Sequence, residues 1–487
     1  MENTVVRNQE PHILWNHFAD INAIPRASKK EDRIVEFMVT FGKNLGLETI
    51  VDPVGNVIIR KSASAGMENR KTVVLQSHLD MVHQKNSDTE FDFDNEGIKM
   101  YVDGDWVKAK GTTLGADNGL GVAAIMSVLS SDNIIHPPLE ALFTIDEETG
   151  MTGAQGLQAG YLNGEILLNL DTEEDDEIDI GCAGGIDITA IKTYKETSNK
   201  EGVPAFKFVI KGLQGGHSGM DIHKGLGNAN KLVNSFLQRV ENMVQVVSID
   251  GGGLRNAIPR ESTVTFLCKT ENIEALTKAY QHYFAELKSN YAAVEPDLSC
   301  TLDKIEGEFS SMGEKEQKEM ILALDKAING VYKMSEEIPD LVEASNNIAR
   351  VSVKNGHIKI LCLTRSSVET SKEEVANSLK ASFEDQGFEV AFSGAYPGWS
   401  PNRDSAILKV LTSIYKDIFK SEPDVVACHA GLECGILGTH YPNMDMISFG
   451  PTIKGAHSPD ERASISSSVR FWKYLQEILK NIPLKKD

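Results

Sequence analysis

The sequence predicts an α/β protein, in which a catalytic domain with a mostly parallel sheet is interrupted by an inserted α+β lid domain. Short, continuously apolar strands alternate with helices at both ends of the chain, as in parallel sheets covered by helices. Between them, strands with polar alternation and long amphipathic helices extend over more residues than a loop contains. We therefore expect residues 1–183 and 397–487 to form the catalytic domain and residues 184–396 to form the lid.

The composition excludes several classes of partner. The chain has 487 residues, of which 41% are hydrophobic, and a formal net charge of −21. This charge repels phosphate backbones and anionic lipids, so we expect no nucleic-acid or membrane partner. The sequence has no signal-peptide core and no apolar run of the roughly 18 to 20 residues that cross a bilayer, so we expect a cytoplasmic protein. Its six cysteines form no Cys-x-x-Cys pair, so a metal would need His, Asp and Glu ligands.

The first predicted elements precede any candidate chemistry. Apolar spacing predicts two helices, and a hairpin follows around Asp-Pro-Val-Gly. These elements cover residues 12–24, 29–45, 48–51 and 56–61. The next strand, 72–77, is continuously apolar and leads directly into His78-Leu-Asp80. Ligands of open α/β sheets bind at the carboxyl ends of strands, so His78 and Asp80 are candidate site residues.

Asp117 lies in a glycine-rich turn, Gly111 to Gly119, just before an apolar helix at 120–129. One interpretation is that Asp117 caps this helix, because Asp is a common residue at helix starts. The other interpretation is that the turn presents a carboxylate to a ligand. The turn alone does not decide between the two.

Two more predicted strands end in acidic residues. The strand 139–145 leads into Asp146-Glu147-Glu148, and the strand 165–169 leads into Leu170-Asp171. Each acid alone is as well explained by solvation or helix capping. Imidazole and carboxylate groups from several strand ends, however, suit zinc or a similar divalent ion, and one carboxylate can bridge two ions. The acidic run 173–177 is interpreted as a solvated loop without chemistry.

Residue patterns also predict the elements of the lid and of the second part of the catalytic domain. The lid is predicted to contain strands at 187–194 and 205–210 and helices at 226–240, 273–287 and 372–386. After a linker rich in Pro and Gly, helices and strands alternate again in four predicted elements. These are a helix at 405–419, a strand near Val425, a helix near Ile436 and a strand at 444–449.

Five motifs, taken in order and spacing, resemble those of the co-catalytic di-zinc exopeptidases, the family of carboxypeptidase G, the tripeptidases, acetylornithine deacetylase and carnosinase. The motifs are His78-Leu-Asp80, Gly-Ala-Asp117-Asn-Gly, Asp-Glu147-Glu148-Thr-Gly, Asn-Leu-Asp171 and Gly-Ala-His457. The resemblance covers nearly the whole chain, and the long insert and the segment His-Ala-Gly-Leu-Glu-Cys-Gly are most similar to its bacterial dipeptidase branch.

The resemblance implies a site with two divalent metal ions. One ion would be held by His78, Asp117 and Asp171, and the second by Asp117, Glu148 and His457. Zinc is expected, with cobalt or manganese as alternatives for the same ligands. Asp80 would orient His78, and Glu147 would be the general base that takes a proton from a water activated by the metals and returns it to the leaving amine.

Substrate-binding residues are also implied. His217, in Gly-Gly-His-Ser-Gly, matches the lid histidine that stabilises the oxyanion. Asn256 and Arg365 are candidates for gripping the substrate carboxylate, for which the guanidinium of arginine is suited. Glu433 is a candidate partner for the α-amino group. The neighbouring residues His429, Cys428 and Cys434 are as well explained by packing.

The expected function is hydrolysis of dipeptides of broad specificity, including Xaa-His, by a cytoplasmic metallodipeptidase. An amidohydrolase that deacylates N-acyl amino acids remains an alternative, as does a catalytically silent metal-binding protein of the same fold. Shorter family members dimerise through the lid, so a homodimer is expected unless the longer lid replaces the second subunit. The sequence decides neither the side-chain preference nor the metal used in the cell.

Overall fold

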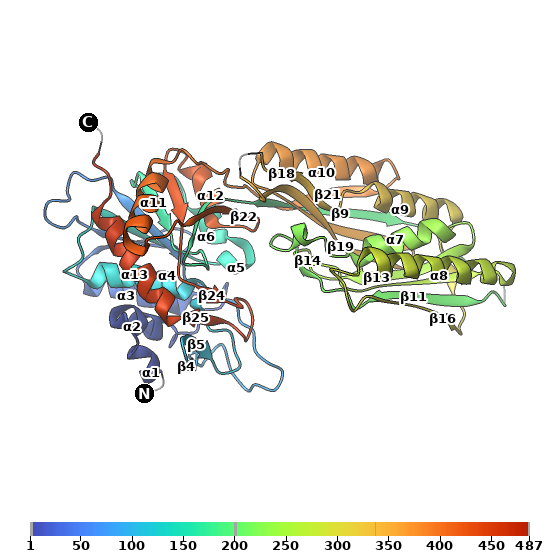
Figure 1. The fold of residues 1–487 in the computed structure, drawn as a ribbon, viewed down its shortest axis with the longest axis horizontal. Coiled ribbons are helices and arrows are strands. Elements are labelled where there is room, and N and C mark those ends of the chain that lie inside the picture. The colour runs from blue at the N-terminus through green and yellow to red at the C-terminus, as the bar shows by residue number, and fades with distance from the viewer. Residues whose placement is uncertain (1–2, 199–201, 337, 486–487) are drawn as a thin grey trace. The chain divides into compact units, whose positions relative to one another are not determined.

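The computed structural model describes residues 3–198, 202–336 and 338–485. The chain divides into two compact units (Figure 1). Unit 1 contains residues 1–181, 399–427 and 432–487, and unit 2 contains residues 182–398 and 428–431. The main divisions lie two residues from the expected domain boundaries. The assignment of the short segment 428–431 to unit 2 was not anticipated.

Unit 1 is built on a sheet that has eight strands in the described part of the chain. In sheet order these are β1 (Glu48–Val51), β2 (Val57–Lys61), β6 (Leu139–Thr144), β3 (Val73–His78), β7 (Ile166–Asn169), β23 (Asp445–Ser448), β8 (Glu177–Cys182) and β22 (Asp424–Cys428). The central pairs β6·β3, β3·β7 and β7·β23 are parallel, as predicted. The outer pairs β1·β2, β2·β6 and β23·β8 are antiparallel. The α/β class is confirmed, but the sheet as a whole is mixed.

The helices of unit 1 include one that is apolar on every side, α4 (Ala116–Ser130), which is buried along most of its length. The others described are α1 (Thr4–Arg7), α2 (His12–Ile21), α3 (Asp32–Asn44), α5 (Glu147–Gly150), α6 (Thr152–Gly156), α11 (Ala406–Phe419), α12 (Glu433–His440) and α13 (Ile465–Lys480). A smaller sheet contains β4 (Met100–Asp103), β5 (Trp106–Ala109), β24 (Ile453–Lys454) and β25 (Arg462–Ser464). The helix predicted at 29–45 corresponds to α3, which begins at Asp32 and not at residue 29, because Lys29 has a left-handed φ of 65°.

Unit 2 is α+β, as predicted, and its large sheet is antiparallel in the described pairs. Its strands are β16 (Ser299–Ile305), β11 (Ala205–Lys211), β15 (Ser262–Cys268), β13 (Val244–Gly252), β19 (Val342–Lys354), β20 (His357–Ser366), β9 (Gly184–Thr193), β21 (Glu389–Tyr396) and β18 (Gly330–Met334). Its longer helices are α7 (Ala229–Val240), α8 (Ile273–Asn290), α9 (Glu314–Lys326) and α10 (Glu369–Glu384). Short pairs add β12 (Gly216–His217) with β14 (Ala257–Ile258), and β10 (Thr197–Ser198) with β17 (Ser310–Ser311).

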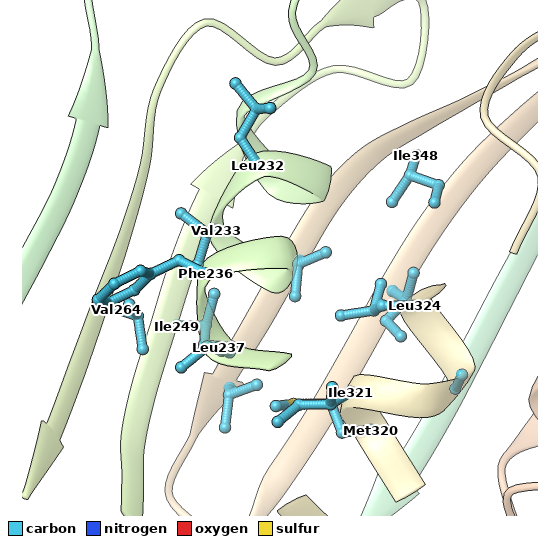
Figure 2. Packing of buried hydrophobic residues seen from close by; sticks show 14 of the residues in the cluster. Leu232, Val233, Phe236, Leu237, Ile249, Val264, Met320, Ile321, Leu324 and Ile348 are labelled. Carbon is cyan, nitrogen blue, oxygen red and sulfur yellow. The ribbon is translucent and has the colours of Figure 1, made fainter. Parts of the chain in front are cut away.

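Unit 2 has its own hydrophobic core, in which α7 and α9 pack their apolar side chains on the sheet (Figure 2). Phe236 of α7 is fully buried and stacks on Phe208 of β11 with a centroid distance of 4.2 Å. Since each unit buries a core of its own, each has the basis for independent stability. Among the described residues, none of the helices combines the length and the apolar character that crossing a bilayer would take.

Candidate metal centre

Three parallel strands bring the predicted ligands to one edge of the sheet in unit 1. His78 is the last residue of β3 and pairs in register with Thr144 at the end of β6. Asn169 ends β7 two residues before Asp171, and Glu147 and Glu148 open α5 just after β6. Parallel neighbours place their carboxyl ends side by side, so residues distant in sequence converge here.

The five expected ligands form two groups that share Asp117. His78, Asp117 and Asp171 offer ligand atoms within 4.8 Å of one another, as do Asp117, Glu148 and His457. The two Asp117 oxygens face different imidazoles: Oδ1 lies 3.2 Å from His78 Nε2, and Oδ2 lies 3.1 Å from His457 Nε2. This is the arrangement that a carboxylate bridging two cations requires.

The remaining contacts complete each group. His78 Nε2 lies 3.5 Å from Asp171 Oδ1, and His457 Nε2 lies 2.9 Å from Glu148 Oε2. Glu148 Oε1 is buried and has no hydrogen-bond partner. Although burial acts in the opposite direction, the neighbouring carboxylates raise the pKa of His78 and the two imidazoles lower the pKa of Asp117. Carboxylates held this close to each other need cations between them, and imidazole with carboxylate is a ligand set that zinc accepts, so the residues fit two divalent ions.

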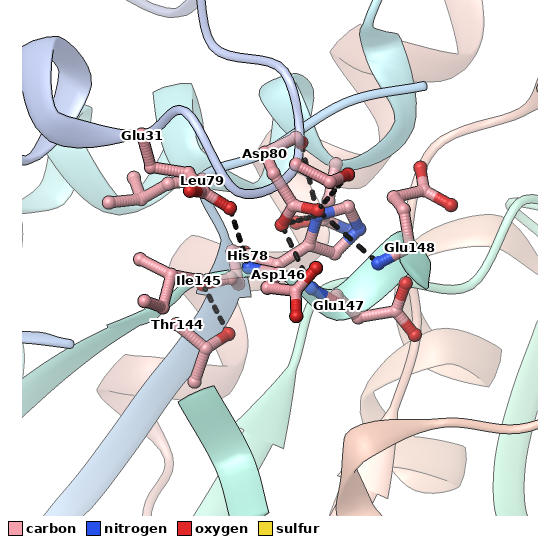
Figure 3. A network of polar contacts seen from close by, with 12 residues as sticks. Glu31, His78, Leu79, Asp80, Thr144, Ile145, Asp146, Glu147 and Glu148 are labelled. Carbon is pink, nitrogen blue, oxygen red and sulfur yellow. Dashed lines mark hydrogen bonds and ion pairs between the residues drawn. The ribbon is translucent and has the colours of Figure 1, made fainter. Parts of the chain in front are cut away.

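Asp80 connects the imidazole of one group to the acidic helix α5 (Figure 3). Its Oδ1 lies 3.3 Å from His78 Nδ1 and accepts a hydrogen bond from the Glu147 amide at 3.1 Å. Its Oδ2 accepts from the Ser28 hydroxyl at 2.7 Å and from the Glu148 amide at 3.3 Å. The Asp80 carboxylate thus contacts both the His78 ring and the start of α5.

Glu147 lies in the same cluster, within 4.8 Å of ligand atoms on His78 and Glu148. Burial, and then the charge of Glu148, raise the pKa of Glu147 well above its ordinary value. A carboxyl in such surroundings is a strong proton acceptor, which is the property that a general base needs.

Two residues that sequence reasoning missed hold the Asp117 turn in place. The Glu461 carboxylate is buried and accepts hydrogen bonds from the backbone amides of residues 114–117, at 2.7, 3.0, 2.7 and 3.3 Å. Arg26 is also buried and donates to the carbonyls of Leu79, Asp80 and Gly115. Glu461 follows His457 by four residues, so its place in that motif was the available signal; Arg26 had none.

The acidic run 173–177, expected to be a solvated loop, is half-buried in part. Glu174 pairs with Lys454, and Asp175 pairs with Arg470. Burial, and then the charge of Asp117, raise the pKa of Glu173 to about 8. The expectation was wrong because these partners come from distant segments of the chain.

His217 and Asn256 are brought together within unit 2. β12 pairs with β14, so His217 stands opposite Ala257, next to Asn256, whose carbonyl accepts from the Ser218 amide at 2.7 Å. His217 Nδ1 accepts from the amides of Gly219 and Met220 at 3.3 and 3.2 Å. With Nδ1 accepting, Nε2 carries the proton, so the ring can donate to an oxyanion.

Arg365 and His429 are also neighbours in unit 2. Arg365, on β20, is 6% exposed and donates from Nη1 to the Tyr396 hydroxyl at 2.9 Å, while its Nε is buried without a partner. His429 contacts Ser345 at 2.8 Å, and burial, then the charge of Arg365, lower the pKa of His429 to about 3. His429 is thus a packed, neutral residue. Cys434 is buried and Cys428 is half-buried, and neither forms a disulfide.

Glu433 is not exposed, as a partner for the α-amino group of a substrate would have to be. Its side chain is 0% exposed, and Oε2 accepts from the Gln76 amide and the Thr144 hydroxyl, each at 2.6 Å. A carboxyl bonded inside the sheet layer is not presented to a substrate amine. This burial argues against the expected partnership with the α-amino group.

Comparison with known proteins places this geometry among peptidases. Residues 74–481 match the model of peptidase family M20/M25/M40. The chain is 44% identical over 477 residues to the cytosol non-specific dipeptidase of Escherichia coli (strain K12), covering 98% of each chain. It resembles the crystal structure of aminoacylhistidine dipeptidase from Vibrio alginolyticus with a TM-score of 0.89 at 43% identity, covering 99% of each chain. The aminopeptidase PepT from Bacillus cereus, at 15% identity and a TM-score of 0.58 over 97% of this chain and 99% of its own, shares the fold.

Proposed function

The chain belongs to the peptidase family M20/M25/M40, and on that premise we propose that it is a metallodipeptidase of broad specificity, including Xaa-His substrates. The observation that carries the proposal is the pair of ligand groups that share Asp117, with Glu147 beside them. The names of its two similar relatives, a non-specific dipeptidase and an aminoacylhistidine dipeptidase, support the substrate class.

His78, Asp117, Asp171, Glu148 and His457 would hold the metals, with zinc as the proposed ion. Two divalent ions held there would polarise the substrate carbonyl and lower the pKa of a water from 15.7 towards about 7. Glu147 then accepts a proton from the attacking water on its carboxylate and delivers it to the nitrogen of the leaving amine. Asp80 keeps the His78 ring and the start of α5 fixed while Glu147 changes its protonation state.

Substrate recognition is proposed for residues of unit 2. The Nε2–H of His217 suits an oxyanion, because an imidazole whose Nδ1 accepts backbone amides donates from its other nitrogen. The unpaired Nε of Arg365 and the side chain of Asn256 suit a terminal carboxylate. A group that recognises the free carboxylate would disfavour a substrate amidated at its C-terminus, and a limit to dipeptides requires a second group that recognises the α-amine.

The deacylase alternative concerns the substrate and leaves the metal centre unchanged. A panel of Ala-His, β-Ala-His, an Ala-containing tripeptide, C-terminally amidated Ala-His and N-acetyl amino acids separates the two functions. We expect kcat/KM to be highest for the free dipeptides, and activity to disappear after dialysis against a chelator and return with zinc. Faster turnover of the N-acetyl amino acids would establish the deacylase, and full activity without metal would refute both.

The Escherichia coli relative is named for the cytosol, and we propose the cytoplasm for this chain as well. A homodimer remains a prediction, which sedimentation of the purified protein would test.

A further inference from the structure

A continuous chain of buried polar side chains crosses the sheet of unit 1 just before the strand ends that carry the ligands. We call it the buried chain. Its members, each at most 5% exposed, are Glu433, Gln76, Asn169, Ser448, Thr172 and Asp179. They come from α12, from strands β3, β7, β23 and β8, and from the loop after β7. Only the two ends, Glu433 and Asp179, are ionisable.

At one end, Glu433 contacts the first of two side-chain amides. Its Oε2 lies 2.6 Å from the Gln76 amide group, and the opposite side of that group lies 2.5 Å from the amide of Asn169. Glu433 Oε1 is buried and has no hydrogen-bond partner. An ionised carboxylate with an unsatisfied buried oxygen is costly, so this end favours a neutral acid.

At the other end, two hydroxyl groups lead to Asp179. Ser448 Oγ lies 2.5 Å from the Asn169 amide and 2.8 Å from Thr172 Oγ1, which lies 2.8 Å from Asp179 Oδ2. If Ser448 donates to Asn169 and Thr172 donates to Asp179, the contact between the two hydroxyls has no proton.

The number of protons is fixed by the chemistry of the groups. Five contacts join the six members, and each contact needs one proton. Each hydroxyl supplies one proton, and each amide donates on one side and accepts on the other, so the four neutral groups supply four. The fifth proton must come from a carboxyl, whichever way the amides are turned. One of Glu433 and Asp179 is therefore protonated and the other ionised.

We propose that Glu433 carries this proton near neutral pH and donates it to the Gln76 amide, whose oxygen then faces Glu433 in place of its nitrogen, and that Glu433 acts as a positioning residue for the metal ligands. Gln76 stands two residues before His78 on β3 and so lies on the same strand face as that ligand, and Asn169 ends β7 two residues before Asp171. The buried chain ties these strand ends together. The charged groups near Glu433 include His78, Asp171, Asp80 and Glu147, and burial raises the pKa of Glu433 to about 7. A neutral Glu433 adds no further negative charge beside the acidic ligands.

Infrared spectroscopy of the zinc-loaded protein at about pH 6 tests whether Glu433 is protonated, and the measurement needs no substrate. The spectrum of the wild type minus that of Glu433→Gln should show a carboxylic-acid carbonyl band. Labelling the carboxyl carbons with 13C is the matched control: the band should shift when glutamate is labelled and stay in place when aspartate is labelled. Absence of the band from the difference spectrum, or a shift on aspartate labelling, would overturn the assignment to Glu433.

Kinetics with Ala-His test the positioning role, and this arm alone rests on the proposed function. Glu433→Leu removes the carboxyl that both Gln76 and Thr144 contact, and we expect kcat and zinc affinity to fall about 10- to 100-fold, as for other residues that orient ligands. Glu433→Gln can still bond to Gln76 and should recover most of this loss, with KM within about threefold of the wild type. A KM raised tenfold or more by Glu433→Gln, with kcat and zinc retained, would instead make Glu433 a partner of the substrate amine.

Discussion

Glu147 and Glu148 are adjacent residues with different surroundings. Glu148 Oε2 lies 2.9 Å from His457, a proposed ligand, whereas Glu147 belongs to a group with His78 and Glu148 and has no contact with His457 among the described ion pairs. Neighbouring side chains at the start of a short helix point in different directions, so only one of the two is placed to share an ion with His457. This difference supports separate roles for the two acids.

Glu147→Gln should therefore lower kcat by about 10² to 10⁴, since it keeps the size of the side chain and removes the proton acceptor. The zinc content, measured by metal analysis, should stay at the wild-type value. Glu148→Gln is the matched variant and should lose zinc. Zinc loss in Glu147→Gln but not in Glu148→Gln would mean that the two roles are exchanged.

We expect His429 to make the stability of unit 2 depend on pH. Its folded pKa of about 3, lowered first by burial and then by Arg365, lies below the unfolded value of about 6.5. Between these values the unfolded chain binds more protons, so the contribution of His429 is fully present above pH 6.5 and is lost as the pH falls, by about 1.4 kcal/mol per pH unit.

The free energy of unfolding of the wild type should then fall more steeply below pH 6.5 than that of His429→Gln. Urea denaturation followed across this range measures both slopes. His282→Gln is the control, because His282 is exposed on α8 in the same unit. Equal slopes for the wild type and His429→Gln would show that His429 is protonated without cost in the folded protein.

At the scale of the elements, the turn before α4 depends both on its local sequence and on contacts with residues distant in the chain. The glycines around Asp117 predicted a turn, and Gly115 indeed has φ of 72°. A side chain at Gly115 would in addition overlap the Arg26 guanidinium and the Met81 sulfur. The sequence showed the first requirement and not the second, because Arg26 lies 89 residues away.

Gly115→Ala should destabilise the protein by about 1–3 kcal/mol more than Gly46→Ala, because an overpacked site adds to the backbone strain. Gly46 has a similar φ of 70°, and nothing lies within 4 Å of a side chain added there. Thermal unfolding of both variants measures the difference. Equal losses would mean that Arg26 moves aside freely and does not hold the turn.

The difference between local sequence signals and distant contacts also explains how much of the fold and the site could be predicted. Strands that end in acid or histidine were recognisable, because a buried strand is a continuous apolar run and its last residue has a fixed place on the sheet edge. Arg26 and the burial of Glu433 were not recognisable, and Glu461 had only its position four residues after His457 as a signal, because each depends on a contact across the sheet or between distant loops. The assignment of residues 428–431 to unit 2 depends on similar contacts, such as that of His429 with Ser345.

For the whole molecule, the division into two units separates metal binding from the stability of unit 2. The five proposed ligands belong to unit 1, and the core around Phe236 belongs to unit 2. A ligand that binds only the folded form stabilises it by RT ln(1 + [L]/Kd), which is about 2.7 kcal/mol at 100 times Kd. Only the unit whose folded form creates the site receives this stabilisation directly.

Removing zinc with a chelator should therefore reduce hydrogen-exchange protection in β3 and α4 of unit 1, and leave it unchanged in α7 and α8 of unit 2. The acidic ligands repel one another once the metals are gone, so the loss should be largest in the peptides that contain Asp117 and Asp171. Asp117→Asn is the matched variant, since it weakens the charge that both ions share, and it should lose protection in the same peptides without chelator. Equal loss of protection in α7 and α8 would contradict independent stability and would show that the two units unfold as one cooperative structure.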